Sequence, residues 1–433
     1  MKFKLRKCIA ASVAVMAVAA VQSVYVSANA APGTTDIPIS DKPLFIGANS
    51  LPVLVMLVLS RDHSMYSEAY TDASDVNSNG KIDYYFKPEI NYYGLFRSDV
   101  CYQYKSGVFE PKKAAEVGKS NGGLFSYCDG TTWNGNFLNY VTTSRMDAVK
   151  KVVMGGERVS LTGDQSVIRH SWIPYDAHSW GKSFVNDYYT SEKGYNPAVK
   201  VNNFVPSSEL SIGQGSDSFG GAFFGVKNYD VMIGIPQTMK IGSMDEYGSK
   251  SSDTDRTAYM NTHAWIWNWA SRESGDGILE GKADGASGTY NISSKGYTVQ
   301  VRPCVDDEEL RDKAACRKYT DKSGNSVYMP SGLIQQRIAQ GAPDFGLITS
   351  GFEGGRNIGK GYIRGRMHDA STEIDPETGR ILINQQDCSS GGYCDVLPTI
   401  NMLGAGYFEN EQGLYWDSCR QDRWAKFYMM GET

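Results

Sequence analysis

Histidine and the short motifs of common enzyme classes are scarce in this chain of 433 residues. It has five histidines, and none stands in the His-Glu-x-x-His arrangement that binds zinc on a helix. It has no Gly-x-Ser-x-Gly turn and no C-x₂-C pair, and its glycine-rich stretch at 213–221 lacks the Lys-Ser/Thr of a phosphate loop. These absences predict that the protein is not an enzyme.

Asp176 and His178 are the best remaining candidates for catalytic residues. A histidine two positions after a carboxylate has the residue types that general base catalysis uses. His178 stands among aromatic residues, however, which favours a packed imidazole that hydrogen-bonds to a backbone carbonyl. We interpret the pair as structural and keep a secreted hydrolase as the least favoured alternative.

Basic residues are in a minority, and several of them fall in a segment that we expect to be removed. The chain has 43 Lys and Arg against 48 Asp and Glu, and no acidic residue occurs through Ala30. A basic start is followed by an apolar run from Cys8 to about Ala20 and by Ser-Ala-Asn-Ala, which ends at Ala30. This order predicts a Sec-type signal peptide over 1–30, and a linker over 31–43 follows it.

Charge and hydropathy also restrict the partners. The mature chain is acidic and has no basic stripe, so we expect no nucleic acid partner. The N-terminal apolar run is short for a membrane span, although an uncleaved anchor is the alternative to a signal peptide. No later stretch is long enough, so we predict no transmembrane segment after signal removal.

Seven cysteines remain after signal removal, and an oxidising compartment favours their pairing. Cys101 and Cys128 bracket one loop, and Cys304 and Cys316 bracket a charged one, so we predict these two disulfides. The pairing of the last three cysteines stays open. A bond between Cys388 and Cys394 is favoured, because the residues between these two are typical of a turn. Cys419 would then be free or paired outside the chain.

A loop rich in oxygen ligands is the strongest metal-site candidate. Side-chain oxygens alternate along it around Gly80, and Lys81 offers its carbonyl; the predicted ligands are Asp75, Asn77, Asn79, Lys81 and Asp83. Ca²⁺ takes six to eight oxygen ligands in a sharply curled loop. The twelfth position is Phe86 rather than a bidentate glutamate, so we predict a Ca²⁺ loop that takes its last ligand from elsewhere. An Asn/Asp/Gly-rich surface turn is the alternative.

The order of expected elements predicts an α/β fold. A continuous apolar run at 51–59 is typical of a buried parallel strand. A helix is expected over 136–154, where a glycine pair supplies the stop and these apolar residues share one helical face: Leu138, Val141, Ala148, Val149 and Val152. Further strands are expected at 345–349 and 362–367. The intervening 157–343 is rich in Tyr, Ser and Gly, with strands expected at 228–234 and 297–302, and we interpret it as a large β-rich insertion.

Three tryptophans alternate along the insertion at Trp265, Trp267 and Trp269. On a strand they would face one side and could form an adhesive aromatic strip. Packing against the domain body is the favoured interpretation, because exposed aromatic patches reduce solubility.

The order of strand, Asp-x-Ser loop, helix and second strand resembles a von Willebrand factor A domain, whose fold is Rossmann-like. That fold carries a metal-ion-dependent adhesion site with the pattern Asp-x-Ser-x-Ser. The match here is Asp62-x-Ser64-x-Tyr66, in which the second serine position holds a tyrosine that is too bulky to replace the lost serine ligand. Thr349 is the candidate for the distant threonine ligand that the resemblance implies. The alternative is that Asp62 and Ser64 cap the following helix.

Longer motifs resemble the N-terminal region of the PilC/PilY family, the tip-associated biogenesis factors of type IV pili. These motifs occur in order along most of the mature chain: Tyr92-Tyr93-Gly94, 133–140 (Trp-Asn-Gly-Asn-Phe-Leu-Asn-Tyr), 144–150 (Ser-Arg-Met-Asp-Ala-Val-Lys), 176–180 (Asp-Ala-His-Ser-Trp) and 345–348 (Phe-Gly-Leu-Ile). Members of the family usually continue into a C-terminal β-propeller, and no propeller blades are evident before Thr433. We therefore expect a von Willebrand factor A-like domain over 44–433 that is incomplete at its C-terminus.

The resemblance implies an exported assembly or adhesion protein whose partners are pilins or minor pilins and, beyond these, a host or surface receptor. It places the protein in the periplasm, at the outer membrane or at the pilus tip of a Gram-negative bacterium, stabilised by Ca²⁺. A secreted Ca²⁺-binding module unrelated to pili is the alternative from a different class.

Overall fold

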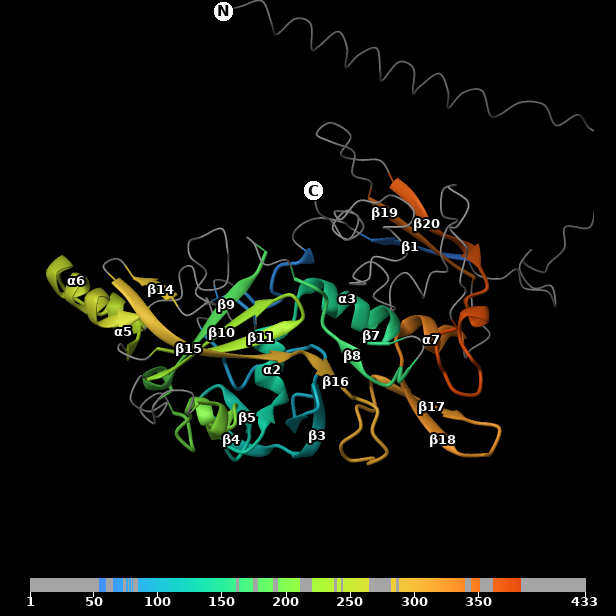
Figure 1. Ribbon diagram of the computed structural model, residues 1–433, viewed down its shortest axis with the longest axis horizontal. Coiled ribbons are helices and arrows are strands. Elements are labelled where there is room, and N and C mark those ends of the chain that lie inside the picture. The colour runs from blue at the N-terminus through green and yellow to red at the C-terminus, as the bar shows by residue number, and fades with distance from the viewer. Residues whose placement is uncertain are drawn as a thin grey trace, which may run out of the picture. The chain divides into compact units, whose positions relative to one another are not determined.

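Strands outnumber helices in the part of the chain that the computed structural model describes (Figure 1). That part comprises residues 54–59, 65–72, 75–76, 78, 80, 85–160, 163–173, 178–189, 194–210, 220–236, 240–242, 244–264, 282–285, 288–338, 344–350 and 361–382. All of them lie in one compact unit, Pro52–Thr433. The mixture of strands with a few short helices agrees with the predicted α/β class.

A three-stranded sheet joins the two ends of the described chain. It has the order β1 (Leu54–Leu59), β19 (Asp344–Ser350), β20 (Gly361–His368), with β1 parallel to β19 and β20 antiparallel to it. The predicted parallel strand and its two later companions are therefore confirmed. The von Willebrand factor A-like core that this parallel pair suggests remains a prediction.

The expectation that β1 is buried on both faces is wrong. Val55 and Leu57 pack against a small core that contains Met154 and Phe345, whereas the alternate side chains point outward. Val58 is 72% exposed and Leu54 is 60% exposed. The physical reason is that apolar elements of the described chain cover only one face of this sheet.

Two larger sheets and three two-stranded sheets make up the rest of the described strands. The five-stranded sheet has the order β14 (Lys282–Gly285), β15 (Gly288–Thr298), β11 (Asp230–Pro236), β10 (Gly221–Lys227), β9 (Trp180–Val185). The six-stranded sheet has the order β6 (Trp133–Asn134), β2 (Val100–Lys105), β3 (Val108–Ala114), β16 (Gln300–Val301), β8 (Ile168–Arg169), β7 (Glu157–Arg158). The two-stranded sheets pair β4 (Glu116–Ser120) with β5 (Gly123–Tyr127), β12 (Lys240–Ile241) with β13 (His263–Ala264), and β17 (Cys316–Thr320) with β18 (Ser326–Pro330).

The region between the predicted helix and β19 is β-rich, as expected. The strands expected at 228–234 and 297–302 correspond to β11 and to β15 with β16. Short helices interrupt the strands: α4 (Ser207–Leu210), α5 (Met244–Gly248), α6 (Asp253–Thr262) and α7 (Leu333–Ile338). No helix among the described residues is long and apolar enough to cross a membrane. The tryptophans at 265, 267 and 269 lie outside the described residues.

The single helix expected over 136–154 is wrong, because the chain forms two helices there. α2 (Gly135–Thr142) ends where Thr143 becomes extended, and Ser144 then caps α3 (Arg145–Met154). The Ser144 hydroxyl accepts from the Asp147 backbone N–H at 3.1 Å, and the Asp147 carboxylate accepts from the Ser144 N–H at 2.8 Å. This reciprocal capping box starts a new helix.

The restart changes which face of α3 is buried. Residues that pack inward are Met146, Asp147, Lys150, Lys151 and Met154, whereas Val152, expected on the apolar face, is 44% exposed. The predicted stop is confirmed, because Gly155 is left-handed at φ 81° and its N–H bonds to the Lys151 carbonyl at 2.9 Å.

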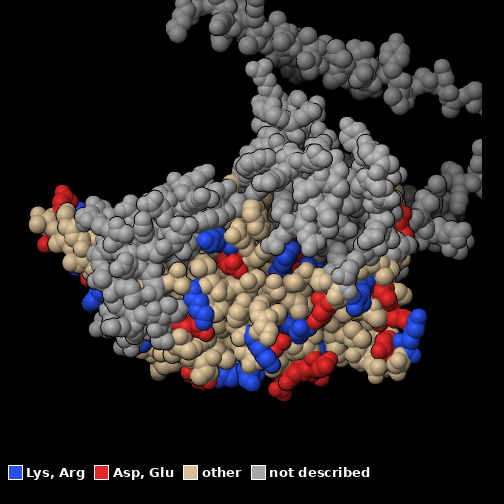
Figure 2. All heavy atoms as spheres, in the orientation of Figure 1, with Lys and Arg blue, Asp and Glu red and all other residues tan. Residues whose placement is uncertain are grey.

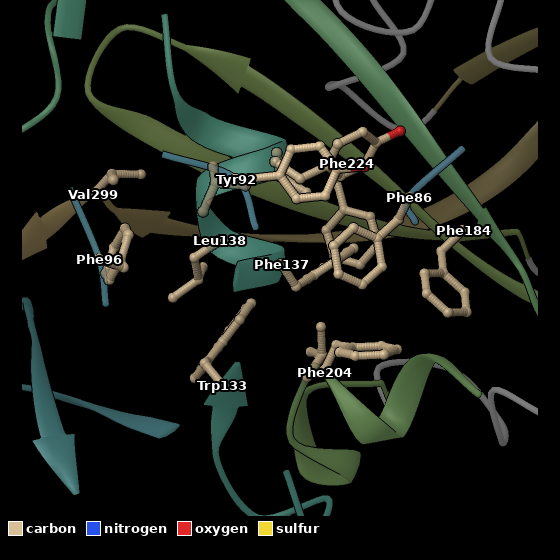
Figure 3. Packing of buried hydrophobic residues seen from close by; sticks show 14 of the residues in the cluster. Phe86, Tyr92, Phe96, Trp133, Phe137, Leu138, Phe184, Phe204, Phe224 and Val299 are labelled. Atoms are coloured by element: carbon tan, nitrogen blue, oxygen red, sulfur yellow. The ribbon is translucent and has the colours of Figure 1, made fainter. Parts of the chain in front are cut away.

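The main core surrounds α2, whose eight residues are all buried. Figure 3 shows Phe86 and Phe137 in contact at its centre, with Phe184, Phe204 and Phe224 around them. The rings of Phe86 and Phe137 meet edge to face with centroids 5.1 Å apart, and those of Phe86 and Phe204 with centroids 4.9 Å apart. Such aromatic pairs contribute about 0.5–1.5 kcal/mol beyond the burial of their area.

Two buried asparagines of α2 hold the preceding loop at 90–96, which we call the asparagine-held loop. Asn136 accepts from the Tyr92 N–H at 2.9 Å and donates to the Ile90 carbonyl at 2.7 Å. Asn139 accepts from the Phe96 N–H at 2.9 Å and donates to the carbonyls of Tyr92 and Phe96, both at 2.8 Å. The side-chain amides thus replace the strand or helix partners that this loop lacks.

The same close approach explains the glycine that follows the two tyrosines. A Cβ at Gly94 would clash with the Thr143 hydroxyl and the Asn139 amide. Asn134, in turn, caps α2 by accepting from the Phe137 N–H at 2.9 Å. The Tyr-Tyr-Gly motif and the Trp-Asn-Gly-Asn motif are therefore two halves of one contact.

Both predicted disulfides are present. Cys101 of β2 bonds to Cys128, 27 positions later, and Cys304 bonds to Cys316 at the start of β17, 12 positions later. Cys388, Cys394 and Cys419 lie outside the described residues, and their pairing stays open.

We expect Asn139→Ala to lower the free energy of unfolding by about 3 kcal/mol, because it leaves one buried N–H and two buried carbonyls without their partner. Urea unfolding followed by tryptophan fluorescence measures the change. Asn261→Ala on the exposed surface of α6 is the matched control, and we expect it to shift stability by less than about 0.5 kcal/mol. Equal effects of the two substitutions would contradict the role of Asn139.

Candidate functional site

The described part of the candidate Ca²⁺ loop is tightly curled. The Asp75 carboxylate accepts from the Gly80 backbone N–H at 2.6 Å, which closes the loop across five positions. Gly80 has φ 82° and Ser78 has φ 58°, so the chain passes twice through the left-handed region. This curl agrees with the predicted role of Gly80 and with the geometry of an oxygen-ligand loop.

The other predicted ligands, Asn77, Asn79, Lys81 and Asp83, lie outside the described residues. Among the residues that are described, no group of three or more His, Cys, Asp and Glu is placed to hold a metal. Ca²⁺ binding by this loop therefore stays a prediction.

The residue at the twelfth loop position is a core residue. Phe86 is fully buried, and its ring packs against those of Tyr92, Tyr140 and Phe204. The preceding Tyr85 is left-handed at φ 62°. The chain thus leaves the loop by inserting an aromatic anchor where a complete EF-hand places its bidentate glutamate.

A buried lysine anchors the chain on the other side of the loop. Lys182 of β9 is 2% exposed at its side chain, and its ammonium donates to the Tyr70 carbonyl at 2.5 Å. It lies 3.7 Å from a carboxylate oxygen of Glu68 and 3.7 Å from one of Asp72. These contacts fix residues 68–72 a few positions before Asp75, and nothing in the sequence pattern pointed to Lys182.

The Asp72 carboxylate is also tied to α2. It accepts from the Tyr140 hydroxyl at 2.5 Å, and Tyr140 packs its ring under the Lys182 ammonium at 5.0 Å. Burial, followed by the charge of Asp72, raises the pKa of Tyr140 well above its ordinary value, so the phenol stays protonated and donates. The loop is thus held between a charged anchor and an aromatic one.

The degenerate adhesion motif contributes a core residue as well. Tyr66 is 2% exposed, and its ring meets that of His178 edge to face at 5.6 Å. Asp62 and Ser64 lie outside the described residues, as does Asp176, and the Thr349 side chain is not described. Tyrosine at this position packs in the interior, which agrees with the expectation that it does not replace a serine ligand.

His170 lies in a buried polar cluster with Asp147 and Glu157. Its side chain is fully buried. Around it, Glu157 accepts from Lys150 at 2.7 Å and from Arg169 at 2.6 Å, and Asp147 accepts from the Ser171 N–H at 2.6 Å. Burial lowers the pKa of the His170 imidazole. A ring so enclosed has no access to a substrate.

Charges on the visible surface of the described residues are mixed. Figure 2 shows Lys and Arg side chains beside Asp and Glu side chains over this face, without a continuous basic area on it. Described surface ion pairs include that of Lys113 with Asp129 at 2.8 Å and that of Arg302 with Asp164 at 2.5 Å.

Comparison with known proteins connects this architecture to a family. Residues 83–218 match the family model described as the PilY1 homolog, small alpha/beta domain, which covers the asparagine-held loop, both central helices and β9. The chain is 32% identical over 388 residues to the type IV pilus biogenesis factor PilY1 homolog of Xylella fastidiosa (strain Temecula1 / ATCC 700964). That match covers 87% of this chain and 23% of the relative. No solved structure matches the chain.

We expect acid to destabilise the protein through His170. Because its folded-state pKa is lowered, the unfolded chain takes up the proton first, and the free energy of unfolding falls as the pH drops below about 6.5. As the pH falls from 8 to 5, the wild type should therefore lose stability relative to His170→Gln, by at most about 1.4 kcal/mol per pH unit. Urea unfolding of both proteins at each pH measures this difference. A stability difference that is constant over this range would exclude the effect.

Proposed function

The chain is a PilY1-like protein, and from this likeness we propose that it is an exported, Ca²⁺-stabilised assembly or adhesion component of a type IV pilus. Its proposed role is non-enzymatic, and its proposed partners are pilins or minor pilins. The proposed location is the cell surface or the outer membrane of a Gram-negative bacterium. The chain spans about a quarter of the length of the relative, so functions of the remainder are not carried over.

The observation that carries the proposal is the identity over 388 residues to a type IV pilus biogenesis factor. The described structure supports it from a second direction, because the residues of the ordered motifs have defined structural roles. Asn136 and Asn139 hold the loop of Tyr92 and Gly94, and Ser144 with Asp147 starts α3. Chance matches of short patterns would not be expected to contact one another in this way, so these contacts support the family likeness.

The Ca²⁺ part of the proposal follows from the two anchors of the loop. Lys182 fixes the chain at residues 68–72, and Phe86 fixes it after the loop. The segment between them carries the predicted ligands Asp75, Asn77, Asn79, Lys81 and Asp83. A cation that binds these oxygens in the native state alone would add its binding free energy to the stability of that state.

We expect the mature chain to bind one Ca²⁺ and to melt at a higher temperature with it. At a free Ca²⁺ concentration of about 100 times Kd, binding to the native state alone adds about 2.7 kcal/mol. Asp75→Ala combined with Asp83→Ala should remove both the binding and the Ca²⁺-dependent shift in Tm, measured by calorimetry and by thermal unfolding with Ca²⁺ or chelator.

The control for this experiment is Asp253→Ala, which removes a carboxylate that is 98% exposed on α6. It should leave the Ca²⁺-dependent shift in Tm unchanged. A wild-type protein that melts at the same temperature in Ca²⁺ and in chelator would overturn the calcium proposal while leaving the pilus proposal standing.

We expect loss of the gene, in a strain that also lacks any paralogue, to reduce surface piliation, twitching and attachment. Complementation with the Asp75→Ala, Asp83→Ala chain should restore less than complementation with the Asp62→Ala, Ser64→Ala chain, since Tyr66 occupies the third adhesion position as a core residue. Electron microscopy and twitching-zone diameters measure the outcome. Normal piliation and attachment without the gene would refute the pilus assignment.

A further inference from the structure

A cavity of about 540 Å³ lies between segments that are distant in the sequence. Its walls come from the asparagine-held loop and the residues after it, from the last turns of α3, from the segment closed by the Cys304–Cys316 disulfide, and from the start of α7. The residues that matter to its chemistry are Tyr93, Arg97, Lys151, Val152, Asp312, Ser331 and Leu333. The described residues of the candidate Ca²⁺ loop, such as Asp75 and Gly80, do not line it.

Apolar side chains gather at this cavity. Leu333 is 50% exposed, Tyr93 is 45% exposed and Val152 is 44% exposed. These are three of the nine large apolar side chains that are exposed among the described residues, and all three line the same cavity. Exposed apolar residues that are scattered singly need no explanation, but a group around a cavity indicates a binding surface.

Beneath them lie polar groups with unused donor capacity. The Lys151 ammonium, 7% exposed at its side chain, donates to the Gly94 carbonyl at 2.5 Å and to Asp312 at 3.3 Å. An ammonium has three N–H donors, so one has no hydrogen-bond acceptor among the described contacts, and the ammonium lies over the Tyr93 ring, 5.1 Å from its centre. Ser331 is 4% exposed, and its hydroxyl has no hydrogen-bond partner within the described chain.

The two carboxylates that line the cavity, by contrast, already accept hydrogen bonds through both of their oxygens. Asp312 accepts from Lys151 through one oxygen and from the Ala315 N–H at 3.2 Å through the other. Asp99 takes both of its oxygens to the Arg97 guanidinium, at 2.9 Å and 2.6 Å. The unmet requirement of the cavity is therefore for an acceptor, and a negatively charged acceptor would also complete the weak pairing of Lys151.

We propose that this cavity binds the C-terminal residue of a partner protein, with its carboxylate on Lys151 and Ser331 and its apolar side chain among Tyr93, Val152 and Leu333. A chain terminus carries two acceptor oxygens and a side chain on one α-carbon. One residue thus supplies both groups that the cavity requires, and capture of a terminal carboxylate is a recurring mode of peptide recognition. The site goes beyond the pilus proposal and does not depend on it.

Fluorescent peptides test the site on the mature chain by polarisation. The probe is Gly-Ser-Gly-Ser-Phe with a free C-terminal carboxylate, compared with its C-terminal amide and with an end-blocked peptide that carries Asp-Phe internally. We expect the free acid to bind at least about tenfold more tightly than the other two. We also expect Ser331→Ala and Lys151→Gln to reduce this preference, since each removes a donor to the carboxylate.

Matched surface substitutions separate the apolar part of the site from general effects on the protein. Val152→Asp and Leu333→Asp should weaken binding of the free acid at least about tenfold. Val117→Asp and Leu124→Asp are the controls, at positions of the β4–β5 hairpin that are 67% and 68% exposed and so more exposed than Val152 and Leu333. They should leave binding unchanged. All four positions are on the surface, so the fold is expected to tolerate them.

Several outcomes would overturn the proposal. Absence of binding by the free acid up to about 1 mM would exclude a terminal carboxylate as the ligand. Equal binding of the amide or of the internal Asp-Phe peptide would show that the terminus is not what is recognised. Self-association of the wild-type chain that Leu333→Asp abolishes would assign the surface to a second copy instead.

Discussion

The hydrogen bonds from Asn136 and Asn139 to the loop at 90–96 are the constraint on which the rest of the structure depends. A helix with all eight residues buried can carry asparagines only if every amide atom finds a partner, since an unpaired buried polar group costs about 1–3 kcal/mol. The backbone of the loop supplies those partners. By fixing the loop, the amides place Tyr92 and Phe96 in the aromatic core and Gly94 within reach of Lys151.

Buried lysines extend this constraint to the surface features. Lys182 ties the segment before the candidate Ca²⁺ loop to β9, and Lys151 ties the asparagine-held loop to the disulfide-closed segment that contains Asp312. Desolvation penalises each ammonium, so each position is determined by the acceptors around it. For Lys151 this penalty dominates and lowers the pKa of the side chain. Lys182 thus holds the chain just before the candidate Ca²⁺ loop, and Lys151 lines the proposed binding cavity.

These features connect the fold to the family likeness. Residues 83–218, which match the PilY1 homolog domain, contain the loop, the helix pair and Lys182, so they include most of the groups that hold the core together. Lys182 lies in β9 and reaches back to Glu68 and Asp72, outside the matched range. The matched domain and the segment before it are therefore one packed unit. The candidate Ca²⁺ loop is the connection between them.

The sequence by itself determined the local features. Alternating oxygens around Gly80 indicated the curled loop, cysteine spacing indicated both disulfides, and the apolar run at 51–59 indicated a parallel strand. Each depends on residues close together in the chain or on composition. The capping pattern at Ser144 was also local and was present in the sequence, yet a continuous apolar periodicity obscured the helix break.

Only the tertiary structure decided which groups meet. Phe86 is an anchor rather than a ligand because rings from α2 and from residue 204 surround it. Tyr66 is interior because His178 lies against it. Lys151, Ser331 and Leu333 line one cavity although 180 positions separate the first two, and β1 keeps one face exposed because apolar elements of the described chain cover only the other. Such contacts depend on the global packing of the chain, and no periodicity of the sequence encodes them.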